Sequence, residues 1–224
     1  HVLLKAMIPS IRKTLLKQEL EGFIIVIFIG FDAGDELFEN EKWRSALEQE
    51  IEEILKDLKS IYVVFLRLLP LNRVAMTWNM IFSFARQTGK FDYFYQVNDD
   101  LTLKDSGWLS KFTSKLDSWK GIGVVGPSDS FNGFYCSLLT QAFVTERHFD
   151  LFEGNFYPLV FRDWKSDRWL SFVYGDSRTA CWTEIEATNG AKGTRYEACP
   201  FPEWKIYLER DRKRIQRIEF KINT

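Results

Sequence analysis

The sequence is poor in cysteine and histidine, the side chains that bind soft metals and form disulfides. It has three cysteines, Cys136, Cys181 and Cys199, and two histidines. The cysteines are odd in number and lack the spacing of a metal site, and with His148 as the only internal histidine a histidine-rich site is excluded. We therefore expect reduced thiols in an intracellular protein, with nucleus or cytoplasm left open.

Long hydrophobic runs are missing too. The longest, residues 23–31, is far shorter than the roughly 20 residues that a membrane-spanning helix needs. The start of the sequence shows no signal peptide, in which a charged segment precedes an apolar one. We expect no attachment to a membrane.

Neither sign of charge dominates, because 30 Lys and Arg stand against 31 Asp and Glu. Such a balance provides no overall basic field to attract nucleic acid or an anionic membrane. One local basic stretch near the end is interleaved with acids, as on a solvated helix face; it contains Arg210, Arg212, Lys213, Arg214 and Arg217. Since 46% of the residues are hydrophobic, the chain can bury a sizeable core, and we expect one domain over residues 1–224.

Three common nucleotide and hydrolase motifs are absent. The sequence has no Gly-x-x-x-x-Gly-Lys-Ser/Thr loop, no Gly-x-Gly-x-x-Gly and no Gly-x-Ser-x-Gly. These absences argue against a P-loop enzyme, a dinucleotide-dependent dehydrogenase and an α/β-hydrolase.

Apolar strand-like runs alternate with helix-like segments through the first half. Strands are predicted at residues 2–8, 23–30, 61–66, 91–97 and 122–125, and helices at 11–20, 41–59, 73–86 and 108–119. This alternation predicts an α/β fold, a mostly parallel Rossmann-like sheet with helices on both faces. The second half is mixed: a loop at 131–135, a strand at 138–145, and helices at 161–174 and 203–221.

Polar residues follow several of these strands. Asn98, Asp99 and Asp100 end an aromatic strand, and adjacent carboxylates there suit Mg²⁺ or Mn²⁺ holding a diphosphate. Arg12 follows the first expected strand and could neutralise phosphate, while Asp32 follows the second and could bind a base or ribose. The alternative for each is a solvated turn or a helix cap.

Two further aspartates, Asp163 and Asp167, are four residues apart in an expected helix and would share one face. One of them could be a general base toward an acceptor hydroxyl. The alternative is a solvated stripe, or Asp163 as a cap with Asp167 paired to Arg168.

The order of motifs resembles the GT-A nucleotide-sugar glycosyltransferases: Ile-Pro-Ser-x-Arg (8–12), a strand ending at Asp32, a long helix, Leu-Asn-Arg (71–73), and a strand ending in Asn-Asp-Asp (98–100). Later motifs resemble a branch that contains base J glucosyltransferase-like enzymes, several of them associated with oxygenases of DNA pyrimidines. These are Val-Gly-Pro (125–127), Gln-Ala-Phe-Val (141–144), His-Phe-Asp-Leu-Phe (148–152), Phe-Tyr-Pro (156–158), Asp-Trp-Lys-Ser-Asp-Arg-Trp (163–169), Val-Tyr-Gly (173–175) and Gly-Thr-Arg-Tyr (193–196).

The resemblance implies a nucleotide-sugar-binding half at residues 1–127 and an acceptor-side half at 128–224. It implies a divalent metal, Mn²⁺ or Mg²⁺, and a UDP-sugar donor. It places donor contacts at Pro9, Arg12, Asp32, Asn72, Arg73, Asn98 and Asp99, the metal at Asp99 and Asp100, and the catalytic carboxylate at Asp163 or Asp167. Many GT-A enzymes have a late histidine ligand that this chain lacks; Glu186 or Asn189 could replace it.

The leading hypothesis is therefore a hexosyltransferase-type glycosyltransferase. The branch suggests a hydroxymethylated pyrimidine in DNA as acceptor, with the aromatic residues at 131–135 holding the base; the alternative acceptor is a protein or a glycan. A non-catalytic interaction domain of the same fold is the second hypothesis, favoured by the missing histidine. A nucleotidyltransferase is the third, and the lack of glycine in residues 8–13 argues against it.

Overall fold

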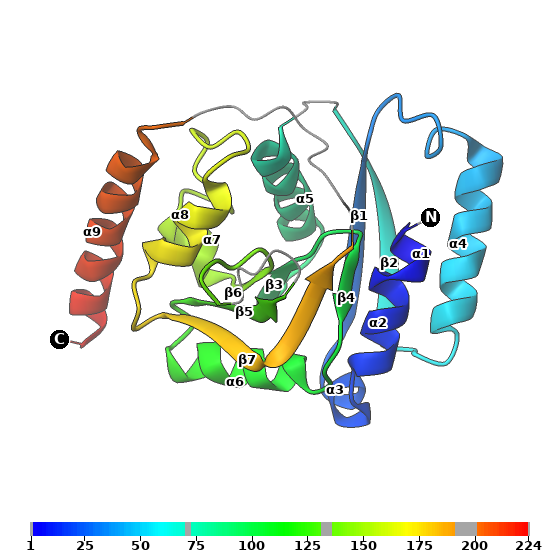
Figure 1. The fold of residues 1–224 in the computed structure, drawn as a ribbon, viewed down its shortest axis with the longest axis horizontal. Coiled ribbons are helices and arrows are strands. Elements are labelled where there is room, and N and C mark those ends of the chain that lie inside the picture. Colours follow the sequence, from blue (N-terminus) through cyan, green and yellow to red (C-terminus); the bar gives the residue numbers. More distant parts are fainter. Residues whose placement is uncertain (1, 70–72, 131–135, 191–200, 224) are drawn as a thin grey trace.

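The computed structural model describes residues 2–69, 73–130, 136–190 and 201–223, and it has an α/β architecture (Figure 1). The α/β prediction is confirmed. The helices are α1 (Val2–Lys5), α2 (Met7–Thr14), α3 (Lys17–Gly22), α4 (Glu41–Leu55), α5 (Val74–Thr88), α6 (Trp108–Ser118), α7 (Arg147–Leu151), α8 (Ser166–Val173) and α9 (Trp204–Asn223). The strands are β1 (Ile25–Asp32), β2 (Ile61–Leu68), β3 (Tyr93–Gln96), β4 (Leu101–Leu103), β5 (Val124–Asp129), β6 (Ala142–Thr145) and β7 (Thr179–Asn189).

A small parallel sheet consists of β1 and β2, with Ile25 opposite Ile61. Successive side chains of each strand point to opposite faces of this sheet, as the two-residue period of a strand requires. Ile27 and Ile29 pack into the cluster that contains Leu47 and Ile51 of α4, while Phe28 packs toward α5. The sheet is therefore covered by helices on both faces, as the strand–helix alternation predicts.

The second sheet has the order β3-β6-β5-β7-β4 and is mixed rather than mainly parallel. β5 pairs with β7 in parallel, whereas β3 and β5 are both antiparallel to β6, and β4 is antiparallel to β7. Phe112 of α6 packs on one face with Val125, and Phe149 of α7 and Trp169 of α8 pack on the other with Val124. Antiparallel pairing enters because β6 follows β5 closely in the chain and turns back beside it.

The prediction of a strand at residues 2–8 is wrong, because this segment forms α1 and the start of α2. Leu3, Met7 and Ile11 are spaced four residues apart and are all buried, which is helical spacing. A short apolar run reads equally well as strand or helix, and here packing against α4 and β4 decides. The predicted helix at 11–20 also divides, since α2 ends at Thr14 and α3 begins at Lys17.

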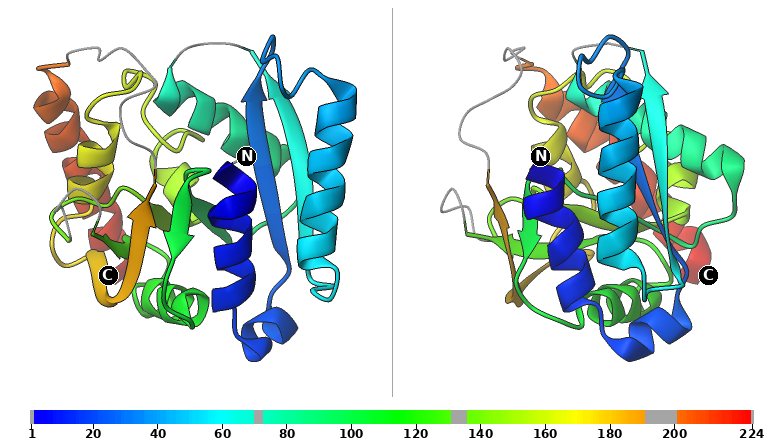
Figure 2. Two further views of the ribbon diagram at one scale, coloured as in Figure 1. Left: turned by 45° about the vertical axis from the view of Figure 1, so that its right-hand side comes forward. Right: turned by 90° about the vertical axis from the view of Figure 1, so that its right-hand side faces the viewer.

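Most other elements lie where the sequence predicts them, with shifted ends. The expected loop at 131–135 lies outside the described residues. The predicted helix at 161–174 begins only at Ser166, and β4, α7 and β7 were not predicted. α9 packs against α8 at the end of the molecule far from α4 (Figures 1 and 2).

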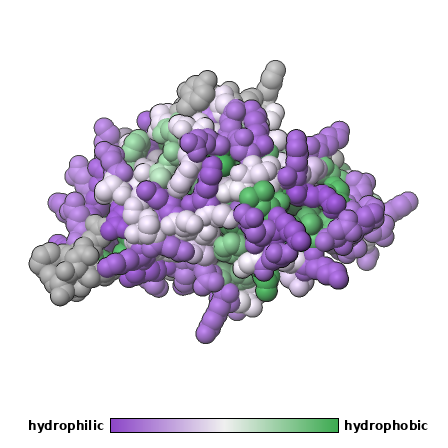
Figure 3. Space-filling model, turned by 90° about the horizontal axis from the view of Figure 1, so that it is seen from below, coloured by the Kyte–Doolittle hydropathy of each residue, from purple (hydrophilic) through white to green (hydrophobic). Residues whose placement is uncertain are grey.

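The expectation of reduced thiols is wrong for two cysteines, because Cys136 and Cys181 form a disulfide with their Cα atoms 5.4 Å apart. Reduced thiols no longer support an intracellular location, which stays a prediction. Over the described ranges, no helix has both the length and the apolar character needed to cross a bilayer. The face seen from below is mostly hydrophilic, with separate small hydrophobic areas (Figure 3).

Candidate functional site

Polar side chains from several strand ends line one cavity of about 1080 Å³. Asp32 is the last residue of β1, Asn98 and Asp99 follow β3, and Asn189 ends β7. β3, β5 and β7 run in the same direction, so Asn98, Asp99 and Asn189 lie at one edge of their sheet, and Asp32 of the other sheet lines the same cavity. The expectation that Asp32 and the acids after Gln96 lie together is borne out in their placement, while their roles stay predictions.

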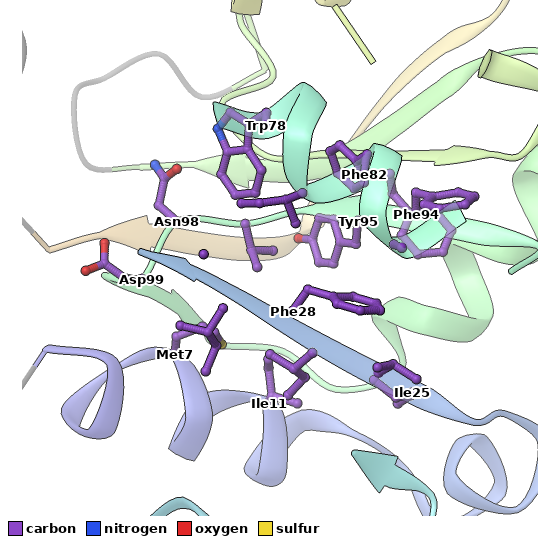
Figure 4. Close-up of a pocket in the computed structure, with 18 of the residues that line it drawn as sticks. Met7, Ile11, Ile25, Phe28, Trp78, Phe82, Phe94, Tyr95, Asn98 and Asp99 are labelled. Atoms are coloured by element: carbon purple, nitrogen blue, oxygen red, sulfur yellow. The ribbon is translucent and has the colours of Figure 1, made fainter. Parts of the chain in front are cut away.

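The cavity is polar at one end and apolar along the rest of its length. Figure 4 shows Asn98 and Asp99 at one end, Ile25 at the other, and aromatic side chains such as Phe28 between them. The apolar walls come from β1, β3 and α5. Trp78 of α5 is partly exposed near the polar end of the cavity, where its ring is a candidate surface for stacking a planar ring.

Tyr95 reaches into this apolar part (Figure 4). Its hydroxyl oxygen is buried and makes no hydrogen bond, and burial raises the pKa of the phenol well above its ordinary value. A buried hydroxyl without a hydrogen-bond partner costs free energy, so the Tyr95 hydroxyl destabilises this part of the core.

Asn98, Asp99 and Asp100 form a tight turn, which we call the 98–100 turn. The backbone N–H of Leu101 donates to the carbonyl of Asn98 at 3.2 Å and closes it. Asp100 is buried and Asp99 is partly exposed, and both line the cavity.

The 98–100 turn has the chemistry of a magnesium or manganese site. Two adjacent carboxylates are hard oxygen ligands, and such ions commonly bind through one or two carboxylates together with substrate phosphates. Among the described residues no group of three or more His, Cys, Asp or Glu could hold a metal alone. Asp99 and Asp100 could therefore hold a cation only together with phosphate oxygens, and their role as metal ligands stays a prediction.

Two residues were considered as substitutes for a late histidine ligand, and they lie differently. Asn189 lines the cavity, with its amide hydrogen-bonded to Gln141 and Asp129. Glu186 instead pairs with Lys104, a hydrogen bond that lowers the pKa of Glu186.

Gln141 and Asp129 do not line the cavity but bind residues that do, Asn98 and Asn189, and neither was predicted. Asp129 ends β5 as Asp32 ends β1, so the same rule of an acid after a buried strand would have identified it. It was missed because the sequence pattern ends this strand at Val125, before Pro127. Gln141 was noted only as part of a motif and gave no chemical signal of its own.

Asp163 and Asp167 do not share a helix face as expected. Asp163 precedes α8 and is buried; its two oxygens accept from Arg73 at 3.2 Å and from the backbone N–H of Trp164 at 2.6 Å. Arg73, predicted to contact the donor, thus binds a carboxylate of the chain beside the start of α5.

Asp167 lies in the first turn of α8 and is partly exposed. Burial raises the pKa of Asp167, although a hydrogen bond from the backbone N–H of Arg168 opposes the shift. Burial raises the pKa of Tyr157, the charge of Asp167 raises it further, and the Tyr157 hydroxyl donates to Gln96 at 2.7 Å. The Tyr157 bond reaches the end of β3, but neither Asp163 nor Asp167, both described, lines the cavity.

Two expected donor residues, Pro9 and Arg12, do not line the cavity. Pro9 lies in the first turn of α2, not after a strand. Arg12 is also on α2, and its guanidinium binds the carbonyl of Ile54 and the carboxylate of Asp57. The strand-end argument for both is therefore wrong, and Asn72 lies outside the described residues.

Several arginines of the basic stretch contact the protein itself. Arg210 pairs with the buried Asp211, which also accepts from Trp169 at 3.1 Å. Arg212 donates to the carbonyl of Phe172, and Arg214 pairs with Glu153. The bonds to Trp169 and Phe172 hold α9 against α8, and the Arg214–Glu153 pair joins α9 to the segment after α7.

The sequence matches no protein-family model, and no curated protein matches it. Among solved structures, a crystal structure of S. aureus TarS is similar, with a TM-score of 0.47 and 7% sequence identity over 73% of this chain. The match covers 36% of the TarS chain, so this protein spans about a third of that structure's length. A likeness this remote leaves the function to be argued from the residues of the chain itself.

Proposed function

We propose that this protein is a metal-dependent glycosyltransferase that uses a nucleotide-sugar donor. The observation that carries the proposal is the convergence of Asp32, Asp99 and Asp100 on one cavity at the carboxyl edge of the strands. In open α/β sheets this edge is where nucleotides bind. A nucleoside diphosphate needs a partner for its base or ribose and a cation for its phosphates, and in this proposal Asp32 supplies the first and Asp99 with Asp100 would hold the second.

In the proposed complex, Asp32 accepts hydrogen bonds from the nucleoside and Trp78 provides an aromatic face beside it. Asp99 and Asp100 hold Mn²⁺ or Mg²⁺. The cation, when bound, supplies positive charge that stabilises the leaving diphosphate. The donor is a UDP-sugar in this proposal, as the motif resemblance implies.

Asp167 is the better candidate for the catalytic base. Its raised pKa brings the carboxylate closer to the range in which it can take a proton from a hydroxyl. The acceptor oxygen attacks the anomeric carbon as its proton passes to Asp167, and the bond from sugar to diphosphate breaks. Asp163 is already held by Arg73 and Trp164, so we assign it the task of fixing the segment that precedes α8.

The acceptor favoured by the structure is a protein or a glycan. The Cys136–Cys181 disulfide is typical of proteins in oxidising compartments, which contain no DNA acceptor in most cells. Arg210, Arg212 and Arg214 contact the protein rather than presenting a free basic face. Hydroxymethylated DNA remains the second acceptor, on the motif resemblance alone.

The test is hydrolysis or transfer of labelled UDP-sugars with and without Mn²⁺, with protein, glycan, hydroxymethylated DNA and unmodified DNA as acceptors. We expect metal-dependent turnover that Asp100→Ala abolishes. Binding without turnover of any donor would instead support a non-catalytic domain. Transfer to hydroxymethylated DNA alone would overturn the choice of acceptor.

The assignment of the base has its own test. Asp167→Asn should leave donor binding intact and lower turnover by roughly 10²–10⁴-fold. Asp163→Asn should mainly lower the melting temperature, because it weakens a buried contact with Arg73. The reverse pattern would move the base to Asp163.

A further inference from the structure

A chain of hydrogen bonds leads from the 98–100 turn into the core. The backbone N–H of Asn98 donates to Oε1 of Gln141 at 3.2 Å. Nε2 of Gln141 donates to Oδ1 of Asn189 at 2.8 Å, and Nδ2 of Asn189 donates to Oδ2 of Asp129 at 2.7 Å. The chain begins at a group that can only donate and ends at one that can only accept, which fixes the orientation of both amides between them.

These polar side chains occupy positions where apolar ones would stabilise the fold more simply. Gln141 and Asp129 are each only 1% exposed. Burying an amide or a carboxylate costs free energy unless it is hydrogen-bonded, so each must be satisfied by the others. Thr140 adds a further bond, its hydroxyl donating to Oδ2 of Asp129 at 2.6 Å.

The backbone is also shaped to bring Gln141 close to β5. A Cβ atom at Gly126 would lie 2.3 Å from the carbonyl oxygen of Gln141, so a side chain there would push the Gln141 segment away. Glycine at this position allows the close approach that places the Gln141 amide between Asn98 and Asn189.

The turn is hydrogen-bonded at both ends, to Gln141 just before β6 and to Gly190 just after β7. Gln141, itself bound to Asn189, holds the N–H of Asn98, and the backbone N–H of Gly190 donates to the carbonyl of Asp100 at 3.1 Å. Asn189 and Gly190 are neighbours at the end of β7. The turn that carries the carboxylates of Asp99 and Asp100 is thus fixed at Asn98 by Gln141 and at Asp100 by Gly190, and Gln141 is itself bound to Asn189 beside Gly190.

We propose that Gln141, Asn189 and Asp129 are positioning residues that hold the 98–100 turn in the form that binds a divalent cation together with a nucleoside diphosphate. This inference rests on the proposed function. Gln141 is the informative member, because it does not line the cavity and acts only through Asn98 and Asn189. Partners of this kind typically contribute 10–100-fold to metal affinity.

The test is calorimetry of UDP binding with and without Mn²⁺ to the wild-type chain and to Gln141→Met, which keeps the volume and removes both hydrogen bonds. We expect affinity for UDP alone to be unchanged and the gain from Mn²⁺ to fall about 10–100-fold. Asp129→Asn, which keeps the shape and removes the charge, should act in the same direction. It carries the test if Gln141→Met does not fold.

Asn79→Leu is the matched control. Asn79 is another buried amide with two hydrogen bonds, both 2.8 Å long and both to the backbone of Tyr157. Its loss should lower the melting temperature and leave the gain from Mn²⁺ unchanged. An undiminished gain in Gln141→Met, or an equal loss in Asn79→Leu, would overturn the positioning role. A wild-type chain with no gain from Mn²⁺ would overturn the proposed function itself.

Discussion

His148 illustrates how a titratable residue can be part of the core rather than of the site. It is fully buried, with Nε2 bonded to the carbonyl of Phe156 at 2.8 Å and Nδ1 to the hydroxyl of Tyr174 at 2.7 Å. A carbonyl only accepts, so Nε2 carries the proton and Nδ1 accepts from Tyr174 in the neutral ring. A second proton could bind only at Nδ1, and the Tyr174 hydroxyl would then have to turn from donor to acceptor.

A pH-dependent loss of stability follows. Burial lowers the pKa of His148 to about 4 from the ordinary value of 6.5. Between these values the unfolded chain binds more protons than the folded one, so stability should fall as pH falls from 6.5 to 4, by about 3 kcal/mol in total. Denaturant unfolding across this range checks it. His148→Gln should remove this part of the slope, and equal slopes in both chains would show that His148 does not cause it.

Individual residues also show what sequence reasoning can and cannot find in a site. Asp32, Asp99 and Asp100 were predicted because each follows an apolar run, and that rule needs only local sequence. Gln141 and Asn189 were not assigned their present contacts, because these depend on β5, β6 and β7 lying side by side. Arg12 was misplaced for a related reason: its segment packs as a helix, which its own residues do not decide.

At the scale of elements, the disulfide ties the segment before β6 to the start of β7. Cys136 and Cys181 are 45 residues apart in sequence. Between them lie Gln141, β6, α7 and α8, and α8 carries Asp167. The sequence could not predict this bond, because an odd number of cysteines at irregular spacing does not reveal a pair.

Breaking the disulfide should destabilise the fold. Closing a loop of this length restricts the unfolded chain, and the expected loss on reduction is about 3–4 kcal/mol. Unfolding curves of the oxidised chain, the reduced chain and Cys136→Ser with Cys181→Ser check this, and thiol titration after denaturation should find two additional thiols on reduction. Coincident curves for the oxidised and reduced chains would contradict the prediction.

At the scale of the whole molecule, the two sheets face each other across the cavity. Among the described strands, β1 pairs only with β2 and β3 pairs only with β6, and both β1 and β3 line the cavity. Strand edges that remain unpaired inside a protein are costly, because buried backbone groups require hydrogen-bond partners. The proposed donor site is divided in the same way, with Asp32 on one sheet and Asp99 on the other.

A ligand that contacts Asp32 on one sheet and Asp99 on the other should therefore draw the two sheets together. With UDP and Mn²⁺ at about 100 times the dissociation constant, the form in which the two sheets are drawn together gains about 2.7 kcal/mol. Exchange of backbone amide hydrogens that requires the sheets to separate should then slow roughly 100-fold. Hydrogen exchange of peptides covering β1 and β3 measures this, with β2 as the internal reference and Asp100→Ala as the control chain. The reason is physical coupling: binding at the polar end holds the ends of β1 and β3 near each other, and pairing of their edges can then satisfy backbone groups along the apolar part. Strong protection of β1 and β3 without ligand would mean that the sheets are already joined, and unchanged exchange with bound ligand would mean that one sheet alone forms the site.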